Sequence, residues 1–210
     1  MNRTALRDLS KADAVMARLI KRVGPCTLQP STPVFLEVPW PFAALVETIA
    51  YQQLTGKAAA TIFSRVKALF PQRSFPTPED LLEMPDDRFR GAGLSRSKIA
   101  AIKDIAAKTL EGMVPAPGAI ERMDDSEILS RLTKIRGVGP WTVEMLLMFK
   151  LGRPDVLPVT DYGVRKGFAQ VYGRKDLPKP SELLEFGERW RPHRTTASWY
   201  LWRSLDSPDL

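Results

Sequence analysis

The amino-acid sequence predicts an all-α fold. Apolar residues recur every three or four positions through most of the 210-residue chain, which is the spacing of an amphipathic helix. Residues typical of helix starts precede several of these stretches, and the sequence has neither alternating strand and helix units nor an internal repeat. The chain is long enough to bury the core of one large domain or of two small lobes.

The predicted helices follow one another along the chain. Thr77 and Pro78 mark one helix start as N-cap and first helical residue, and Ser95 can cap another. The strand-like run Val34 to Val38 allows no more than a vestigial sheet in the first forty or so residues. The spacing predicts helices over Ala12 to Val23, Phe42 to Tyr51, Lys57 to Phe70, Ser95 to about Leu110, Ser126 to about Ile135, and Tyr162 to Tyr172.

The composition favours a basic protein without cofactors. Lys and Arg number 31 against 24 Asp and Glu, so the net charge is +7, which suits a polyanionic partner but is also found in proteins that bind no nucleic acid. The lone Cys26 excludes an intramolecular disulfide and a cysteine-ligated iron–sulfur cluster. The sequence has neither a secretory signal nor an apolar run of about 20 residues. We therefore expect a cytoplasmic protein, nucleoid-associated if bacterial, that is not in a membrane.

The most informative stretch begins with Ile135 to Trp141, IRGVGPW, between two apolar helical patterns. Gly137 and Gly139 permit positive φ and a close approach of the backbone to a ligand, and Val138 would plug between the helices. The second helix would then begin with unsatisfied N–H groups, which suit a phosphate oxygen. This pattern predicts a helix-hairpin-helix, a motif that binds the DNA backbone whatever the base sequence. An ordinary helix–turn corner also favours glycine and remains the alternative.

Three motifs in order, IAYQQLTGKAA, VLPVTDYGVRKG and RWRPHRTTASWYLW, resemble the helix-hairpin-helix DNA glycosylases, and within them the alkylbase branch of 3-methyladenine DNA glycosylase II. The resemblance spans about Pro41 to Trp202. It implies a segment at 1–40 that packs on the C-terminal lobe, followed at 41–210 by two helical lobes with the active-site cleft between them. The N-terminal lobe of longer members would be reduced or missing, which leads us to expect a broader range of substrates.

Asp161 is the candidate catalytic carboxylate. The resemblance places the catalytic aspartate after the hairpin and a Gly/Pro-containing loop, and Asp161 occupies that position. Cleavage of an N-glycosidic bond builds positive charge on the sugar, which a fixed carboxylate stabilises while it guides the attacking water. Asp is also a favoured N-cap, so Asp161 could instead cap the helix that follows, and the two roles are compatible. Asp155 is the rival carboxylate, but it lies within the loop and off the motif.

Trp141 and the cysteine count indicate the kind of glycosylase. Bifunctional members of the family carry a lysine nucleophile at the position of Trp141, so the resemblance implies a monofunctional enzyme that uses water and leaves an abasic site. A base alkylated at a ring nitrogen is cationic and leaves easily, so it needs little general-acid help, and His193 is the only histidine.

Aromatic side chains suit a flipped cationic base, through stacking and cation–π attraction. By resemblance Trp202 packs against the flipped base and sugar. For each candidate the alternative is core packing, which we favour for Trp190 and Trp199. The full set of pocket candidates is Trp141, Tyr162, Trp202, Met145 and Trp40.

The loop Gln52 to Lys57 joins two predicted helices, and in the family it supplies the side chain that fills the space left by the extruded base. Gln53 falls at this wedge position with Leu54 as the alternative, and an ordinary helix–helix turn remains plausible. The candidates for contact with the DNA backbone are Gly137, Gly139, Thr142, Arg136, Lys134 and Lys57, with Arg96 and Lys98 as further positive charge.

The hairpin of the family also holds a monovalent cation, Na⁺ or K⁺, through main-chain carbonyls, which here would be those of Thr133, Ile135 and Val138. We expect a monomer that binds duplex DNA containing alkylated bases such as 3-methyladenine and 7-methylguanine. Two alternatives stay open: a glycosylase for other damaged or mismatched bases, and a non-catalytic module that recognises DNA structure.

Overall fold

The computed structural model describes residues 3–30, 39–54 and 56–206, and every regular element among them is a helix. The chain divides into two compact units, which we describe separately. The terminal unit combines Met1–Pro30 with Leu147–Leu210, and the central unit is Ser31–Leu146. Within the described ranges no helix has the length and apolar character to cross a membrane. The predicted strand at 34–38 lies outside the described residues.

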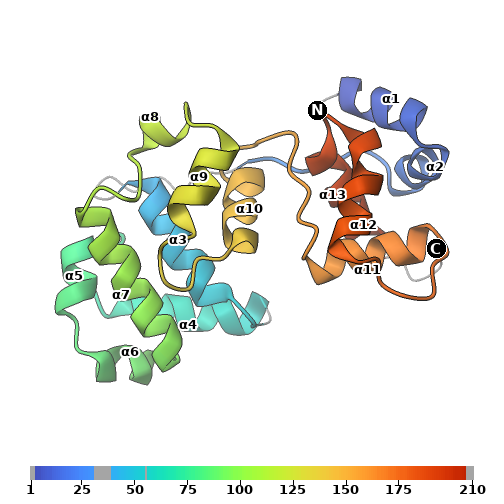
Figure 1. Ribbon diagram of the computed structural model, residues 1–210. Coiled ribbons are helices and arrows are strands. Elements are labelled where there is room, and N and C mark those ends of the chain that lie inside the picture. The colour runs from blue at the N-terminus through green and yellow to red at the C-terminus, as the bar shows by residue number, and fades with distance from the viewer. Residues whose placement is uncertain (1–2, 31–38, 55, 207–210) are drawn as a thin grey trace. The chain divides into compact units, whose positions relative to one another are not determined.

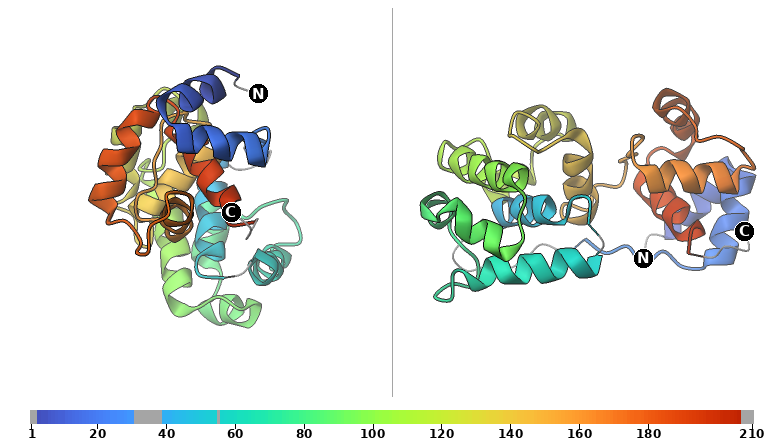
Figure 2. Two further views of the ribbon diagram at one scale, coloured as in Figure 1. Left: turned by 90° about the vertical axis from the view of Figure 1, so that its right-hand side faces the viewer. Right: turned by 90° about the horizontal axis from the view of Figure 1, so that it is seen from below.

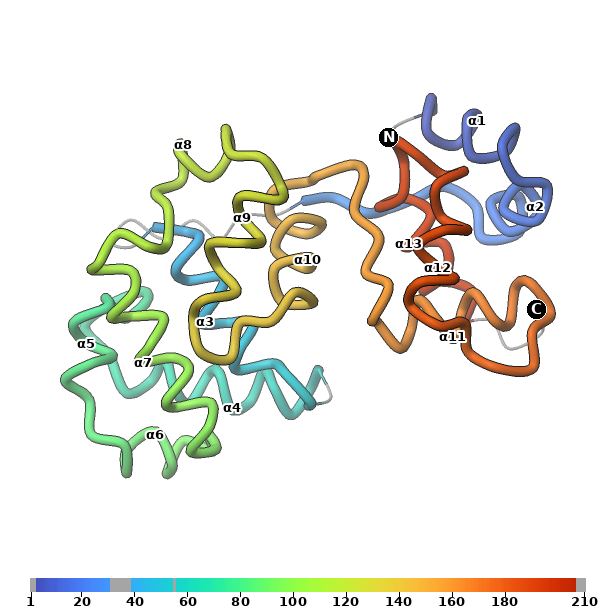
Figure 3. Tube along the Cα trace, in the orientation of Figure 1, coloured from blue at the N-terminus to red at the C-terminus, as the bar shows by residue number. Residues whose placement is uncertain are grey.

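The central unit is built around α3 (Trp40–Tyr51), which lies among the other helices of the unit in Figures 1 and 3 and is buried along most of its length. Phe42, Leu45 and Ile49 of this helix are fully buried, and it packs against α4 (Gly56–Ala68) and α7 (Arg96–Leu110). A helix that is apolar all round belongs in a core. The unit contains α3 (Trp40–Tyr51), α4 (Gly56–Ala68), α5 (Pro78–Glu83), α6 (Asp86–Ala92), α7 (Arg96–Leu110), α8 (Pro117–Ile120), α9 (Asp125–Leu132) and the start of α10 (Pro140–Phe149).

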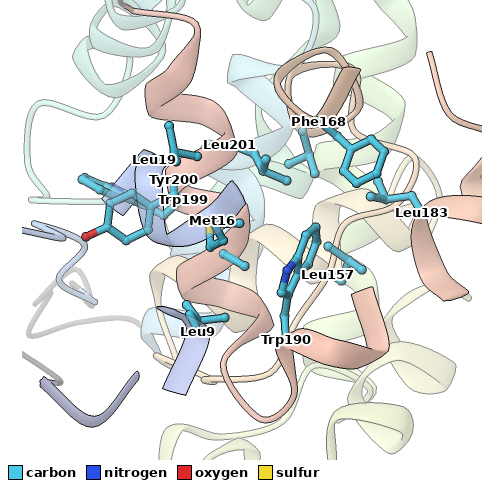
Figure 4. Packing of buried hydrophobic residues seen from close by; sticks show 12 residues of the cluster. Leu9, Met16, Leu19, Leu157, Phe168, Leu183, Trp190, Trp199, Tyr200 and Leu201 are labelled. Carbon is cyan, nitrogen blue, oxygen red and sulfur yellow. The ribbon is translucent and has the colours of Figure 1, made fainter. Parts of the chain in front are cut away.

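The terminal unit joins the two ends of the chain in one core, and the views in Figures 1 and 2 show its blue N-terminal helices beside its orange and red C-terminal ones. Leu9 and Met16 from the N-terminal helices pack into the same cluster as Phe168, Trp190 and Tyr200 (Figure 4). The unit contains α1 (Arg3–Ala12), α2 (Ala14–Val23), α11 (Tyr162–Val171), α12 (Pro180–Gly187), the 3₁₀-helix η1 (Glu188–Trp190) and α13 (Arg194–Ser204).

The helix starts at Thr77 and Ser95 are confirmed. The Thr77 side chain accepts a hydrogen bond from the Asp80 N–H while the Asp80 side chain accepts one from the Thr77 N–H, and the Ser95 hydroxyl accepts from the Lys98 N–H. These caps satisfy first-turn N–H groups that have no partner within the helix.

Other predicted boundaries were wrong. The helix predicted over Ala12 to Val23 is two helices, because Ala12 ends α1 and Asp13 caps α2. The helix predicted to run from Ser126 to Ile135 ends at Leu132, where the chain turns into the hairpin. The helix predicted from Phe42 begins at Trp40, and the one predicted to reach Phe70 ends at Ala68.

Asp13 ties the N-terminal helices to the C-terminal core. Its buried carboxylate caps α2 through the N–H groups of Val15 and Met16, and it also accepts hydrogen bonds from the Tyr172 hydroxyl at 2.6 Å and the Trp190 indole N–H at 3.1 Å. Burial alone would raise the pKa of Asp13, but these hydrogen bonds outweigh it and hold the pKa below the ordinary value of 3.8.

Replacing Asp13 with alanine should destabilise the protein by about 3 kcal/mol, since it removes a helix cap and leaves the half-buried Tyr172 hydroxyl and the buried Trp190 indole N–H without their acceptor. Because the folded pKa lies below 3.8, the carboxylate contributes its stability above pH 3.8 and loses it as the pH falls through the folded pKa. Urea unfolding at pH 7 and at stepwise lower pH measures both effects. Replacement of the exposed Asp176 with alanine is the control and should change neither; a matching loss there would contradict the assignment.

Candidate active site

In the terminal unit, Asp161 caps α11 and is held by two donors. Its Oδ1 accepts a hydrogen bond from the Val164 N–H at 2.7 Å and another from the Trp202 indole N–H at 2.8 Å. The predicted N-cap role is therefore confirmed. One donor lies on α11 and the other on α13, so the carboxylate is fixed in orientation by two helices that pack against each other.

Trp202 is oriented by its neighbours as well as by Asp161. Its ring stacks on Phe149 with centroids 5.8 Å apart and planes 27° apart. A Cβ on Gly163 would lie 2.8 Å from Trp202 Cδ1 and 3.2 Å from Asp161 Oδ1. Only glycine at position 163 therefore leaves room for the indole to reach the carboxylate. Tyr162, between Asp161 and Gly163, is 64% exposed.

The rival carboxylate and the only histidine are engaged elsewhere in the terminal unit. Asp155 forms ion pairs with Arg194 at 2.7 Å and Arg191 at 2.6 Å. His193 is buried, with its Nε2 3.3 Å from the Asp8 carboxylate. Neither group contacts Asp161 in the hydrogen bonds described: Asp155 is bonded to the start of α13, and His193 connects the start of α13 with α1.

In the central unit, the chain between α9 and α10 forms the predicted tight turn. Gly137 has a φ of +77°, and the Val138 side chain is buried. A Cβ on Gly137 would lie 2.7 Å from the Cβ of Ala101 on α7, so both backbone conformation and packing require glycine there. The Asp104 carboxylate accepts a hydrogen bond from the Arg136 N–H at 2.7 Å and anchors the turn to the same helix.

Gly139 has a different role from Gly137. It does not adopt a positive φ, so the need for backbone freedom inferred for both glycines holds only at Gly137. A Cβ at Gly139 would meet no protein atom within 4 Å. The open space beside Gly139, at the start of α10, is consistent with close approach of a ligand to the backbone.

The loop after α3 is attached to this hairpin. The Gln52 side-chain amide donates to the Gly137 carbonyl and to the Thr142 hydroxyl, both at 3.1 Å. Gln53 follows with a φ of +57°, which is a strained conformation for a residue other than glycine. The Lys98 ammonium donates to the Ala50 carbonyl at 2.8 Å, and partial burial lowers the pKa of Lys98. These bonds hold a strained residue at the predicted wedge position.

The remaining candidates divide by exposure. Trp141 is 36% exposed and Met145 is half-buried, whereas Trp40 is buried at the first turn of α3. Thr142 is buried and its hydroxyl is bonded to Gln52, so any contact from this residue to DNA would come from its main chain. The core role preferred for Trp190 and Trp199 is confirmed, and the exposed candidates are Lys57, Leu54, Lys134, Arg136 and Arg96.

The carbonyls expected to hold a cation fit that role in part. Thr133 and Ile135 come directly after α9 ends at Leu132, where helix carbonyls lack partners within the helix. The Ile135 carbonyl accepts a hydrogen bond from the Val138 N–H at 3.1 Å, which leaves its second lone pair for an ion. The cation stays a prediction.

Four residues that shape these two regions were not among the predicted site residues: Gln52, Asp104, Gly163 and Arg194. Gln52 and Asp104 act through hydrogen bonds across long sequence separations, which spacing does not reveal. The Asp-Tyr-Gly sequence was a readable signal for Gly163, because glycine is an unfavourable residue within the first turn of a helix unless close packing requires it.

Comparison with known proteins gives consistent matches. Residues 46–192 match the model of the HhH-GPD superfamily of base excision DNA repair proteins. DNA-3-methyladenine glycosylase 1 of Schizosaccharomyces pombe is 39% identical over 201 residues, which are 96% of this chain and 86% of that protein. The solved structure of 3-methyladenine DNA glycosylase from that yeast in complex with abasic DNA has a TM-score of 0.87 and 37% identity, covering 99% of this chain and 98% of the other. DNA-3-methyladenine glycosidase from Bacillus halodurans has a TM-score of 0.83 and 32% identity, covering 98% and 91%.

Proposed function

Because the chain belongs to the HhH-GPD superfamily of base excision DNA repair proteins, we propose that it is a monofunctional DNA glycosylase that removes alkylated bases from duplex DNA and leaves an abasic site. The observation that carries the proposal is the Asp161 carboxylate, fixed through Oδ1 by the Val164 N–H and the Trp202 indole. A carboxylate held in this way stabilises an adjacent sugar cation without having to reorganise as the charge develops.

In the proposed reaction the alkylated base departs as the glycosidic bond breaks, and the bond electrons leave with the base. Asp161 stabilises the resulting oxocarbenium ion, guides a water molecule to the anomeric carbon and accepts the proton that the water loses as the new C–O bond forms. Trp141 stands at the hairpin position where a bifunctional enzyme would carry a lysine, so we expect no Schiff base and no strand cleavage by the protein.

The other site residues are proposed to bind and open the DNA. Gly137, Gly139 and the main chain of Thr142 would meet a phosphate, with Arg136, Lys134 and Lys57 adding positive charge. The carbonyls of Thr133, Ile135 and Val138 would hold a Na⁺ or K⁺ ion, which would add positive charge beside that phosphate. Gln53, or Leu54, would fill the space left by the flipped base. The aromatic contacts to the base would come from Trp141, Tyr162 and Trp202, with Met145 and Trp40 as further lining residues.

Release of free base tests the proposal. Purified protein is incubated with methylated duplex DNA and with duplexes containing 8-oxoguanine or a mismatch, and the released bases and the DNA strands are separated by chromatography. We expect release of 3-methyladenine and 7-methylguanine, with strands that break only after alkali. Binding without release would favour a non-catalytic module, and release of only the oxidised or mismatched base would favour another specificity. An activity confined to 3-methyladenine would contradict the broader range that we expect.

Alanine substitutions at the two hairpin glycines should affect different properties, one the affinity for DNA and the other the stability of the fold. Gly139→Ala places a methyl group in open space, so we expect unchanged stability but about tenfold weaker binding to an abasic duplex, because the methyl group blocks the phosphate. Gly137→Ala should instead destabilise the protein by about 2 kcal/mol, since alanine tolerates neither the positive φ nor the contact with Ala101.

Fluorescence anisotropy of labelled duplex and urea unfolding measure the two effects. Gly91→Ala in α6 is the matched control, because its Cβ also meets no neighbour and its φ is not positive. Unchanged binding by Gly139→Ala would contradict the phosphate contact. The affinity of the unaltered protein should also fall steeply with salt, and a flat response would contradict contact with several phosphates.

A further inference from the structure

The first part of the loop that leads to Asp161, residues 153–156, is bonded to the first turn of α13. The Thr195 N–H donates to the Pro154 carbonyl at 3.0 Å. The Thr195 hydroxyl donates to the Arg153 carbonyl at 2.6 Å and accepts from the Val156 N–H at 2.9 Å. One threonine therefore satisfies three main-chain groups of a segment that has no regular structure of its own.

Arg194 holds Asp155 in the same part of the loop. Its side chain is 11% exposed, and its Nε and Nη2 donate to the two carboxylate oxygens of Asp155 at 2.7 and 3.0 Å. Nη2 also donates to the Asp155 main-chain carbonyl at 2.9 Å. A bidentate Arg–carboxylate pair with an added main-chain bond has a defined geometry, unlike a single exposed ion pair.

The far end of the same helix holds Asp161 itself, through the Trp202 indole. Residues 194 and 202 are eight positions apart, so the two attachments lie about 12 Å apart along the axis of α13. Both ends of the segment from Arg153 to Asp161 are therefore attached to the same rigid helix, α13. The position of the Asp161 carboxylate depends on both attachments.

We propose that Arg194 and Thr195 are positioning residues for Asp161: by fixing residues 153–156 to the start of α13, they set the place of the carboxylate that Trp202 holds near the end of the helix. The proposal rests on the proposed glycosylase function for its kinetic readout. Asp155 then serves to accept the hydrogen bonds from Arg194, which explains why the loop carries a second carboxylate. A displacement of about 1 Å in a reacting group is enough to slow a reaction by up to about a hundredfold.

A matched set of variants separates positioning from stability. Thr195→Val keeps the shape of the side chain and removes both hydroxyl bonds, whereas Thr195→Ser keeps the hydroxyl. Arg194→Met removes the bidentate pair, and Arg194→Lys keeps only the charge. Arg191→Gln is the control, because Arg191 bonds to the same Asp155 carboxylate at 2.6 Å but precedes α13 and makes no bond to the main chain of the loop in the contacts described.

Single-turnover base release per folded molecule, affinity for an abasic duplex, and urea unfolding are measured for each variant. We expect Thr195→Val and Arg194→Met to lower the single-turnover rate about tenfold or more while affinity stays within about twofold. Thr195→Ser should recover most of the rate, Arg194→Lys only part of it, and Arg191→Gln should react as the unaltered protein does. Variants that are less stable but react at an unchanged rate when folded would overturn the proposal, and so would equal losses of rate and affinity.

A second readout does not require activity. The Val164 N–H lies in the first turn of α11, where its hydrogen-bond acceptor is the Asp161 carboxylate and no helix carbonyl is available. Hydrogen exchange at this amide should therefore be faster in Thr195→Val than in Thr195→Ser. Equal exchange would overturn the positioning role whether or not the protein releases bases, whereas faster exchange in a protein that releases no base would contradict the proposed function alone.

Discussion

Asp161→Asn should reduce single-turnover release of alkylated bases by about a thousandfold and leave the fold intact. Asparagine has the same shape and is a favoured N-cap, so its side-chain oxygen can still accept from the Val164 N–H and the Trp202 indole. What the substitution removes is the negative charge, which is the property required to stabilise a sugar cation. Rate, affinity for an abasic duplex and thermal unfolding together separate loss of charge from loss of structure.

The control for this substitution is Asp176→Asn, which removes an exposed carboxylate from the same unit. We expect this variant to react at the rate of the unaltered protein. A rate for Asp161→Asn within tenfold of the unaltered protein would show that the chemistry does not depend on this carboxylate. A large loss of affinity or of stability would show instead that Asp161 acts through the structure.

Gly167→Ala should destabilise the protein by about 3 kcal/mol. Gly167 lies where α11 crosses α13, and a Cβ there would overlap the Leu201 carbonyl and lie 3.0 Å from the Ser204 hydroxyl. A main-chain carbonyl within a helix cannot move aside as a flexible side chain can, so the two helices would have to separate. The same separation would draw Trp202 away from Asp161, so we also expect activity to fall.

Urea unfolding of the full chain, followed by tryptophan fluorescence, measures this loss, because Trp190 and Trp199 are buried in the terminal unit. Gly91→Ala again serves as the control, as it adds a methyl group to a helix without any neighbour in reach. A destabilisation below about 1 kcal/mol would mean that the crossing of α11 and α13 has room to relax.

The sequence predicted those features that depend on neighbouring residues. The all-α class, the tight turn at Gly137, the caps at Thr77 and Ser95, and the cap at Asp161 all follow from local patterns, and the structure confirms them. The motifs also predicted the family, which the comparisons confirm. Local patterns predict caps and turns reliably because the hydrogen bonds that define them join residues only a few positions apart.

Features that depend on distant parts of the chain were missed. Helix α1 buries little more than Ala5 and Leu9, so its apolar face is too narrow to be recognised from the sequence. The helix forms because the C-terminal core covers this face. Helix α13 buries Thr195, Ser198 and Ser204 alongside its apolar residues, which removes the periodic pattern. The contacts of Gln52 with the hairpin span 85 and 90 positions. No spacing rule covers such distances.

The joining of the two chain ends in one core has a consequence for the order of synthesis. The central unit is a single continuous stretch and contains all the residues of its own core once Leu146 has left the ribosome. The hydrogen bond from Trp190 to Asp13 spans 177 positions, so the first two helices have no core to join until nearly the whole chain has been made. During translation the hairpin can therefore form well before the unit that carries Asp161.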